Sequence, residues 1–320
     1  MDFPVFDLHC DTTFALLGED FCNAGSLKEN NLHIDLNRAS KLPGYAQCFA
    51  CFTTQDASET SGLSKIDPVQ LFERELATFH RELERNSNKI CQAFTAKDIK
   101  DNLKKGIMSG ILTIEGPAGF GFDPELLEDL YKVGFRISTL GWNEKNPLCG
   151  SHVTGGGLTD QGRIYVKEAQ RLGMIVDVSH ISDEAFWDII NITNAPIIAS
   201  HSNSRSVNNV SRNITDDMFM AICNTGGVVG INLYAPFVGE SPDVDAVCNH
   251  IFHFLSLDPT GKHISLGGDL DGGHPLPDGI LGIQDYPKIA DKLIQRGLDA
   301  QTVRNIFWNN AVGVIERCCI

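Results

Sequence analysis

Positive charge is scarce in this chain of 320 residues. Lysine and arginine number 26 against 41 aspartate and glutamate residues, so the formal net charge at pH 7 is -15. Proteins that bind nucleic acids or anionic membranes neutralise phosphate groups with a basic surface. Since no cluster of lysine and arginine departs from the acidic average, we expect neither a nucleic acid nor a membrane surface as a partner.

Long hydrophobic runs are also missing. No window approaches the ~20 consecutive apolar residues of a membrane-spanning helix. The first ten residues, MDFPVFDLHC, contain no basic segment and no long apolar stretch, and a secretory signal peptide needs both. We therefore predict a cytoplasmic protein.

Cysteine is too sparse for a disulfide scaffold, with ten residues in 320. In a reducing compartment such cysteines are free thiols. Cys48 and Cys51 have CxxC spacing, but the chain has no second CxxC pair and the segment around them, AQCFACF, is apolar. We interpret it as a buried strand rather than as a zinc knuckle or a redox pair.

A nucleotide-binding loop of GxGxxG spacing is absent as well, which disfavours a doubly wound sheet. Instead, short apolar segments alternate with amphipathic ones, as in parallel strands joined by crossover helices. We predict an α/β fold in which residues 1–320 form a single (β/α)8 barrel of the TIM type. The expected strands are Phe3–Phe6 with the residues after it, Tyr45–Phe52, Gly110–Glu115, Phe135–Leu140, Met174–Ser179, Pro196–Ser200, Gly227–Leu233 and His263–Gly267. The expected helices include Pro68–Asn86, Ala96–Lys105, Pro124–Lys132, Gln161–Leu172, Glu184–Ile192, Asp216–Asn224, Asp243–Leu257, Tyr286–Arg296 and Ala300–Arg317.

Ionisable residues recur where the predicted strands end, on the face where TIM-type barrels carry their active sites. Each has an ordinary alternative interpretation, such as a solvated strand end or a turn. Together they supply imidazoles and carboxylates, which suit Zn²⁺. They exceed what one tetrahedral ion needs and suit two ions ~3.5–4 Å apart that share a carboxylate. These residues are His9, Asp11, Glu115, His180, His201 and Asp269.

Several blocks of the sequence are similar to those of one known family. They are DLHCDT at the start, LTIEGP, GGGLTDQGRIYVKEAQRLGMIVDVSHIS, PIIASHSNSRSV followed by SRNITDD, GGDLDG and the closing NNAVGVIE. In order and spacing they resemble the membrane (renal) dipeptidases, metallopeptidases of the amidohydrolase-like barrel superfamily. Eukaryotic members carry a signal peptide and a lipid anchor, and this chain looks like a soluble bacterial-type member.

The resemblance implies a binuclear site with two Zn²⁺ ions. His9, Asp11 and Glu115 would be ligands of one ion. Glu115 would bridge to the second ion, which His180 and His201 would also hold, and a hydroxide would form the other bridge.

The resemblance also implies roles in catalysis and substrate binding. Catalysis is assigned to Asp269, as the acid/base that takes a proton from the bridging water and delivers it to the leaving amine, together with the bridging Glu115. Arg212 would bind the C-terminal carboxylate of the substrate, a role that suits a guanidinium. Tyr234 would lie at the substrate.

Trp142 departs from the family pattern. It stands where the mammalian enzymes have a histidine that contacts the substrate near the scissile carbonyl. An indole offers one N–H donor and a large apolar face, so the substrate preference is expected to differ. His152 lies nearby in the sequence, and we interpret it as an ordinary loop residue rather than as a substitute.

Three functions remain in competition at this point. The first is a zinc dipeptidase, including one that accepts a D-residue at the C-terminal position. The second is a hydrolase of another small amide, such as an N-acyl amino acid or a β-lactam. The third is a barrel that keeps a metal without catalysis, which would be expected to lack a bridging ligand or the acid/base, whereas all are present. The resemblance further suggests a homodimer.

Overall fold

The chain forms a closed barrel of eight parallel strands. The computed structural model describes residues 2–19, 21, 25–55 and 65–319. In the sheet the order is β2-β1-β9-β8-β7-β6-β5-β4, and pairing of β2 with β4 closes it. A ninth strand, β3, lies outside the barrel along β4. The strands are β1 Val5–Cys10, β2 Tyr45–Phe52, β3 Ile90–Gln92, β4 Met108–Glu115, β5 Phe135–Thr139, β6 Ile175–Asp177, β7 Ile197–Ala199, β8 Val228–Ile231 and β9 Ile264–Leu266.

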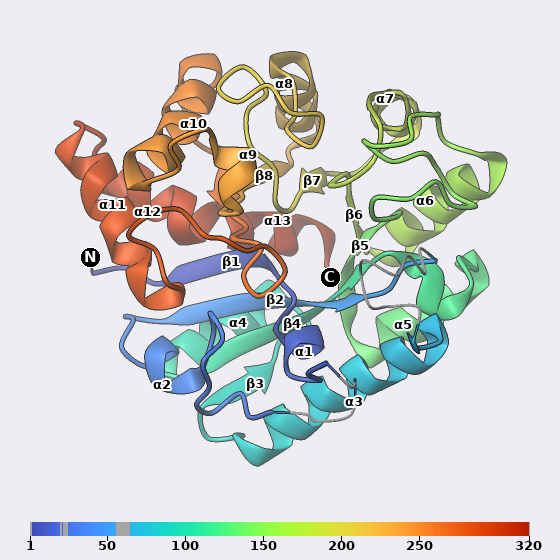
Figure 1. The fold of residues 1–320 in the computed structure, drawn as a ribbon, viewed down its shortest axis with the longest axis horizontal. Coiled ribbons are helices and arrows are strands. Elements are labelled where there is room, and N and C mark those ends of the chain that lie inside the picture. The colour runs from blue at the N-terminus through green and yellow to red at the C-terminus, as the bar shows by residue number, and fades with distance from the viewer. Residues whose placement is uncertain (1, 20, 22–24, 56–64, 320) are drawn as a thin grey trace.

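Helices surround the barrel and connect its strands (Figure 1). Four of the longer helices begin directly after a serine or threonine whose hydroxyl accepts a backbone N–H of the first turn, which satisfies a group that the helix itself leaves unpaired. The helices are α1 Thr12–Ala15, α2 Leu36–Ala39, α3 Pro68–Arg85, α4 Ala96–Lys104, α5 Leu127–Val133, α6 Asp160–Leu172, α7 Asp183–Ile192, α8 Asp216–Thr225, α9 Ala235–Val238, α10 Val244–Leu257, α11 Tyr286–Gln295, α12 Ala300–Arg304 and α13 Asn310–Cys318.

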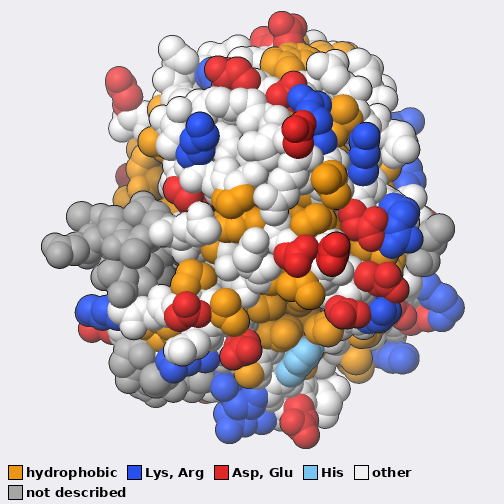
Figure 2. Space-filling model, turned by 90° about the vertical axis from the view of Figure 1, so that its right-hand side faces the viewer, with side chains coloured by type: hydrophobic (Ala, Val, Ile, Leu, Met, Phe, Trp, Pro, Cys, Tyr) orange, Lys and Arg blue, Asp and Glu red, His pale blue; other side chains and the backbone are white. Residues whose placement is uncertain are grey.

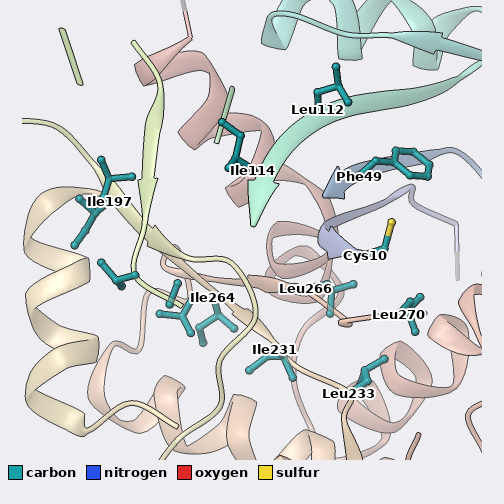
Figure 3. Close-up of a cluster of buried hydrophobic side chains, with 14 of the residues drawn as sticks. Cys10, Phe49, Leu112, Ile114, Ile197, Ile231, Leu233, Ile264, Leu266 and Leu270 are labelled. Carbon is teal, nitrogen blue, oxygen red and sulfur yellow. The ribbon is translucent and has the colours of Figure 1, made fainter. Parts of the chain in front are cut away.

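The barrel strands are short and apolar because both of their faces are covered. Consecutive residues point to opposite faces, and Ile197 belongs to the larger hydrophobic cluster while Ile198 belongs to a smaller one. The larger cluster, part of which Figure 3 shows, includes buried side chains from the surrounding helices. The smaller one joins the other strand face to α13 and to the π-helical turn before it, where Trp308 is in ring contact with Phe6.

The predicted barrel is confirmed, and each expected strand corresponds to one barrel strand. Three local features differ from the expectations. Strand β3 was not expected, because in a three-residue segment only Ile90 is buried. The expected helix Ala300–Arg317 is interrupted by a π-helical turn at Asn305–Asn309, which places Ile306, Phe307 and Trp308 in the interior in succession. Helix Pro124–Lys132 begins as a 3₁₀ turn before α5.

Cys48 and Cys51 both lie in β2 and are buried, which confirms the interpretation of this segment as a core strand. Both are free thiols. They belong to different hydrophobic clusters, because residues three apart on a strand point to opposite faces.

Acidic and basic side chains are interspersed on the face of the molecule that Figure 2 shows. Charged pairs along helices include Lys97 with Asp101 and Arg171 with Glu168. Within the described residues, no helix combines the length and the apolar character needed to cross a lipid bilayer.

Candidate metal centre

Strand β1 brings His9 and Asp11 to the end of the barrel where the strands end, which we call the mouth. The backbone N–H of Asp11 donates to the carbonyl of Leu270, which fixes the strand end beside the turn after β9. The imidazole Nε2 of His9 lies 3.4 Å from Asp11 Oδ2. His9 Nε2 and Asp11 Oδ1 are both buried, and neither has a hydrogen-bond partner among the described residues. Two unpaired buried atoms of ligand type on adjacent side chains fit a bound cation.

Glu115, the last residue of β4, occupies the centre of the mouth. Its Oε2 lies 3.3 Å from His9 Nε2, and its Oε1 lies 2.9 Å from His180 Nε2 and 3.7 Å from His201 Nε2. Gly116 follows with a φ of +77°, and a side chain there would meet the carbonyl oxygen of Thr53 at 2.0 Å. The sharp turn that aims Glu115 inward therefore requires glycine.

His180 and His201 follow strands β6 and β7, and their Nε2 atoms lie 2.9 Å apart. His180 has a φ of +70°, which is costly for a residue with a side chain. Its Nδ1 lies 3.0 Å from Asn143 Oδ1. Since an amide oxygen only accepts hydrogen bonds, Nδ1 carries the proton and Nε2 carries the lone pair.

A buried relay sets the tautomer of His201 in the same way. Asp177 accepts the backbone N–H groups of Ser179 and Ser200, each at 2.9 Å, and also the hydroxyl of Ser200. Because the hydroxyl proton points to Asp177, Ser200 Oγ accepts from His201 Nδ1 at 2.7 Å. His201 Nε2 therefore also presents a lone pair. Two facing lone pairs cannot bond to each other, but they can share a cation with Glu115.

Burial and charge shift the pKa values across the mouth in opposite directions. Burial, aided by the positive charge of Arg212, lowers the pKa of His180 well below 6.5, and burial next to His9 does the same to His201. Burial and the Asp11 carboxylate raise the pKa of Glu115 to about 8. For His9, burial lowers the pKa, but the carboxylates of Glu115 and Asp11 outweigh it and raise the pKa well above its usual value. Neutral imidazoles beside crowded carboxylates are the environment that a divalent cation stabilises.

Asp269 lies in the turn after β9 with a φ of +54°. Its Oδ2 accepts from Asn232 Nδ2 at 3.1 Å, and its Oδ1 lies 3.9 Å from His9 Nε2. Burial, and then the Asp11 carboxylate, raises the pKa of Asp269. A side chain on Gly272 would meet Asp11 Oδ2 at 2.0 Å, so glycine lets this turn approach the carboxylates.

A cavity of about 360 Å³ opens at the mouth. Trp142 lines it and packs edge-on against Phe52, with ring centroids 5.2 Å apart. Tyr234 lies on another part of the wall. The cavity is lined by Asp11, Phe14, Phe52, Glu115, Trp142, Asn143, His180, Tyr234, Phe237, Asp269, Asp271, Gly272, Gly273 and His274.

Arg212 is not among the residues that line the cavity, but its guanidinium carbon lies 5.8 Å from the ring centroid of Phe237, which does. It is 4% exposed and donates to Ser202 Oγ at 2.7 Å and to the carbonyl of His201 at 2.9 Å. Its Nε has no hydrogen-bond partner among the described residues. His152 is also not among the residues that line the cavity, and its ring nitrogens lie 3.0 Å from Ser211 Oγ and 2.9 Å from Asn143 Oδ1.

The structure thus brings together all six expected strand-end residues, and it adds polar partners that sequence reasoning missed. Asn143 and Asn232 hold His180 and Asp269. Asp177 and Ser200 hold His201. The available signal was weak: Asp177 and Ser200 stand at the ends of apolar strand segments, as the expected ligands do.

Comparison with known proteins also indicates a dipeptidase family. The sequence model of the family described as membrane dipeptidase (peptidase family M19) matches residues 1–318. An uncharacterized dipeptidase of Schizosaccharomyces pombe is 34% identical over 223 residues, which are 68% of this chain and 54% of that protein, so the match spans about half of that relative's length. The dipeptidase VerJ of Clonostachys rogersoniana is 26% identical over 98% of this chain and 84% of its own.

Solved structures are similar over their full length. The structure described as dipeptidase AC, a metallopeptidase of family M19, is 25% identical with a TM-score of 0.86, covering 100% of this chain and 99% of its own. A metallopeptidase from Rhodobacter sphaeroides, solved with a phosphinate mimic of the dipeptide L-Ala-D-Ala, is 26% identical. Its TM-score is also 0.86, with 99% of this chain and 100% of that chain covered.

Proposed function

Since the chain belongs to the membrane dipeptidase family of peptidases, we propose that it hydrolyses dipeptides with the help of two zinc ions held at the barrel mouth. The observation that carries the proposal is the convergence of two lone-pair-bearing imidazole nitrogens and the Glu115 carboxylate. A pair of divalent cations bound there would activate a water molecule and polarise the scissile carbonyl.

The ligands divide between two positions. We assign His9, Asp11 and Glu115 to one ion, and Glu115, His180 and His201 to the other. The two oxygens of Glu115 face the two groups separately, which supports the bridging role. The donors are imidazole nitrogens and carboxylate oxygens, a set that suits Zn²⁺.

Asp269 is assigned the proton transfer. It is held by Asn232 through Oδ2, while Oδ1 points toward the His9 side of the mouth. A raised pKa helps a carboxylate to hold a proton briefly and then release it to the leaving amine. Glu115 would contribute to catalysis by holding both ions in place.

The substrate would lie in the 360 Å³ cavity. Arg212 keeps its Nε–H unpaired, and we assign this donor to the C-terminal carboxylate of the dipeptide. Trp142 and Tyr234 would contact the substrate side chains from the cavity wall. The R. sphaeroides relative binds a mimic of L-Ala-D-Ala, and we extend acceptance of a C-terminal D-residue to this chain.

The test compares the wild-type enzyme with D269N. In the wild type we expect bound metal in the proportion of two ions per chain and cleavage of L,L- or L,D-dipeptides that chelation abolishes. D269N should keep its metal and lose about 10²–10⁴-fold in kcat. D129N, which changes an exposed carboxylate that pairs with Lys132, is the matched control and should leave both quantities unchanged.

N-acyl amino acids and a β-lactam belong in the same substrate panel. Cleavage of these and not of dipeptides would replace the dipeptidase with the other amide hydrolase. Full activity of purified D269N would overturn the role of Asp269, and a chain that takes up no metal would overturn the whole proposal.

A further inference from the structure

A second group of metal-ligand side chains lies at the opposite end of the barrel, where the strands begin. Cys223 stands near the end of α8, Asp258 directly follows α10, and His263 directly precedes β9. One thiol sulfur, one carboxylate oxygen and one imidazole nitrogen all lie within 4.8 Å of one another. The three residues are half-buried, so solvent and ions can reach them.

The hydrogen bond of His263 to the backbone leaves Nε2 as the ring nitrogen that can bind a metal. His263 Nδ1 lies 2.7 Å from the carbonyl oxygen of Gly227. A carbonyl only accepts, so Nδ1 carries the proton and the lone pair is on Nε2. A histidine whose other nitrogen donates to a backbone carbonyl is the usual arrangement of metal-ligating histidines. This bond involves a residue outside the three ligands and is independent of their proximity.

The carboxylate is oriented by its own loop. Asp258 accepts the backbone N–H of Thr260 at 3.1 Å and the Thr260 hydroxyl. A carboxylate offers about four lone-pair positions, so these bonds leave room for a further partner. Burial, and then the Asp258 carboxylate, raises the pKa of the Cys223 thiol to about 12. The same negative charge would attract a cation, and a cation would release the thiol proton.

We propose that Cys223, Asp258 and His263 form a binding site for a thiophilic divalent cation such as Zn²⁺, separate from the centre at the mouth. Sulfur, nitrogen and oxygen donors from three side chains, with water in a fourth position, match a tetrahedral zinc site. The bound ion would connect the ends of α8 and α10 to the start of β9. Soft-ligand preference favours zinc, cobalt or cadmium over magnesium or calcium.

Titration of the full-length, chelator-stripped protein with Co²⁺ tests the site without measuring activity. Thiolate bound to Co²⁺ gives an intense near-ultraviolet charge-transfer band, and none of the ligands proposed at the mouth contains sulfur. We expect the band in the wild type by three equivalents, since two ions would occupy the mouth, with an intensity that corresponds to one thiolate-bound Co²⁺ per chain. We also expect displacement by Zn²⁺ and no displacement by Mg²⁺.

Two variants and one control assign the band. C223S should abolish it, and H263N should weaken binding at least tenfold while leaving an amide donor for the Gly227 carbonyl. C91S, which removes an exposed thiol, should leave the band unchanged. Absence of the band in the wild type, or its persistence in C223S, would overturn the proposal. If C223S fails to fold, an unchanged Co²⁺ affinity in H263N overturns it equally.

Discussion

On both sides of the barrel mouth, a buried aspartate accepts backbone N–H groups and fixes the end of a strand, but the two aspartates differ in what else they orient. On the β1 side, buried Asp7 accepts the backbone N–H groups of His9 and Gly268 and so ties the strand end to its neighbour. On the β6 side, buried Asp177 accepts the backbone N–H groups of Ser179 and Ser200. Of the two, only Asp177 also orients an expected metal ligand, because the Ser200 hydroxyl that donates to Asp177 accepts a hydrogen bond from the ring of His201.

The two sides therefore offer a cation different kinds of ligand, namely negatively charged carboxylates on one side and oriented neutral imidazoles on the other. The β1–β9 side gathers carboxylates, with Asp11 and Asp269 near His9. The β6–β7 side presents neutral imidazoles whose tautomers are fixed by Asn143 and Ser200. A cation on the first side would be held mainly by negative charge, and one on the second by directed lone pairs. The two positions should therefore respond differently to substitution, ionic strength and pH.

Glu115→Gln should have the largest effect, since it removes the charge that both sides share. The amide keeps the size of the side chain but cannot bridge two cations. We expect loss of metal from both positions and a fall in kcat/KM of about 10³-fold or more, as several kcal/mol of transition-state stabilisation disappear. Metal analysis after dialysis and steady-state kinetics measure this. E168Q, at an exposed helix pair, is the control, and retention of two ions in E115Q would contradict the bridge.

Ser200→Ala should affect the imidazole side alone. The substitution breaks the relay from Asp177, so His201 is free to adopt the other tautomer. Loss of such an orienting partner costs about 10–100-fold in metal affinity. We expect one ion to become easier to remove in competition with a chelator while the other keeps its affinity.

Ser204→Ala is the matched control for this experiment. Ser204 Oγ is buried and makes no hydrogen bond among the described residues, so its removal tests the loss of a buried hydroxyl without a relay. Equal weakening in S200A and S204A would show that the relay has no specific role.

His250→Gln should have the smallest effect, and this effect should be seen only when the free energy of unfolding is compared at different pH values. Buried His250 accepts from the Ser204 N–H and donates to the Val238 carbonyl, and burial lowers its pKa to about 4. Its pKa in the unfolded chain is near 6.5, so the unfolded state binds a proton first and stability falls as the pH drops from 6.5 toward 4.

Urea unfolding of metal-free protein at pH 7 and pH 5 measures this. The free energy of unfolding of the wild type should fall by about 2 kcal/mol more than that of H250Q over this interval. The glutamine can keep both hydrogen bonds, so the comparison isolates the titration. Identical pH dependence of the two proteins would contradict a depressed pKa at His250.

Much of the architecture follows from the sequence because buried parallel strands are apolar on both faces. The segments GILTI and PIIAS predict β4 and β7 to within about three residues of their observed ends. The π-helical turn at Asn305–Asn309 could not be predicted, since its residues also fit an α-helical pattern and tertiary packing decides between them.

The site likewise has features that the sequence predicts and features that it does not. The convergence of residues such as His9 and Glu115 could be predicted because their chemical type and their place at strand ends are both local features. The pairing of Asn143 with His180, or of Asn232 with Asp269, spans 37 residues in each case and depends on loop conformations that no local pattern reveals. The position of Arg212 beside Phe237 of the cavity wall likewise depends on loop conformation.

His180, Asp269 and the neighbouring Asp271 share a left-handed backbone, with φ values of +70°, +54° and +68°. Glycine would adopt these angles without strain, whereas each residue with a side chain costs on the order of 1–3 kcal/mol. Thermostability selection acting on this chain alone would therefore favour glycine at His180 and Asp269, to which we assign metal binding and proton transfer. At these positions, thermal stability and activity compete. A library of variants selected only for heat resistance should therefore accumulate substitutions that inactivate the enzyme.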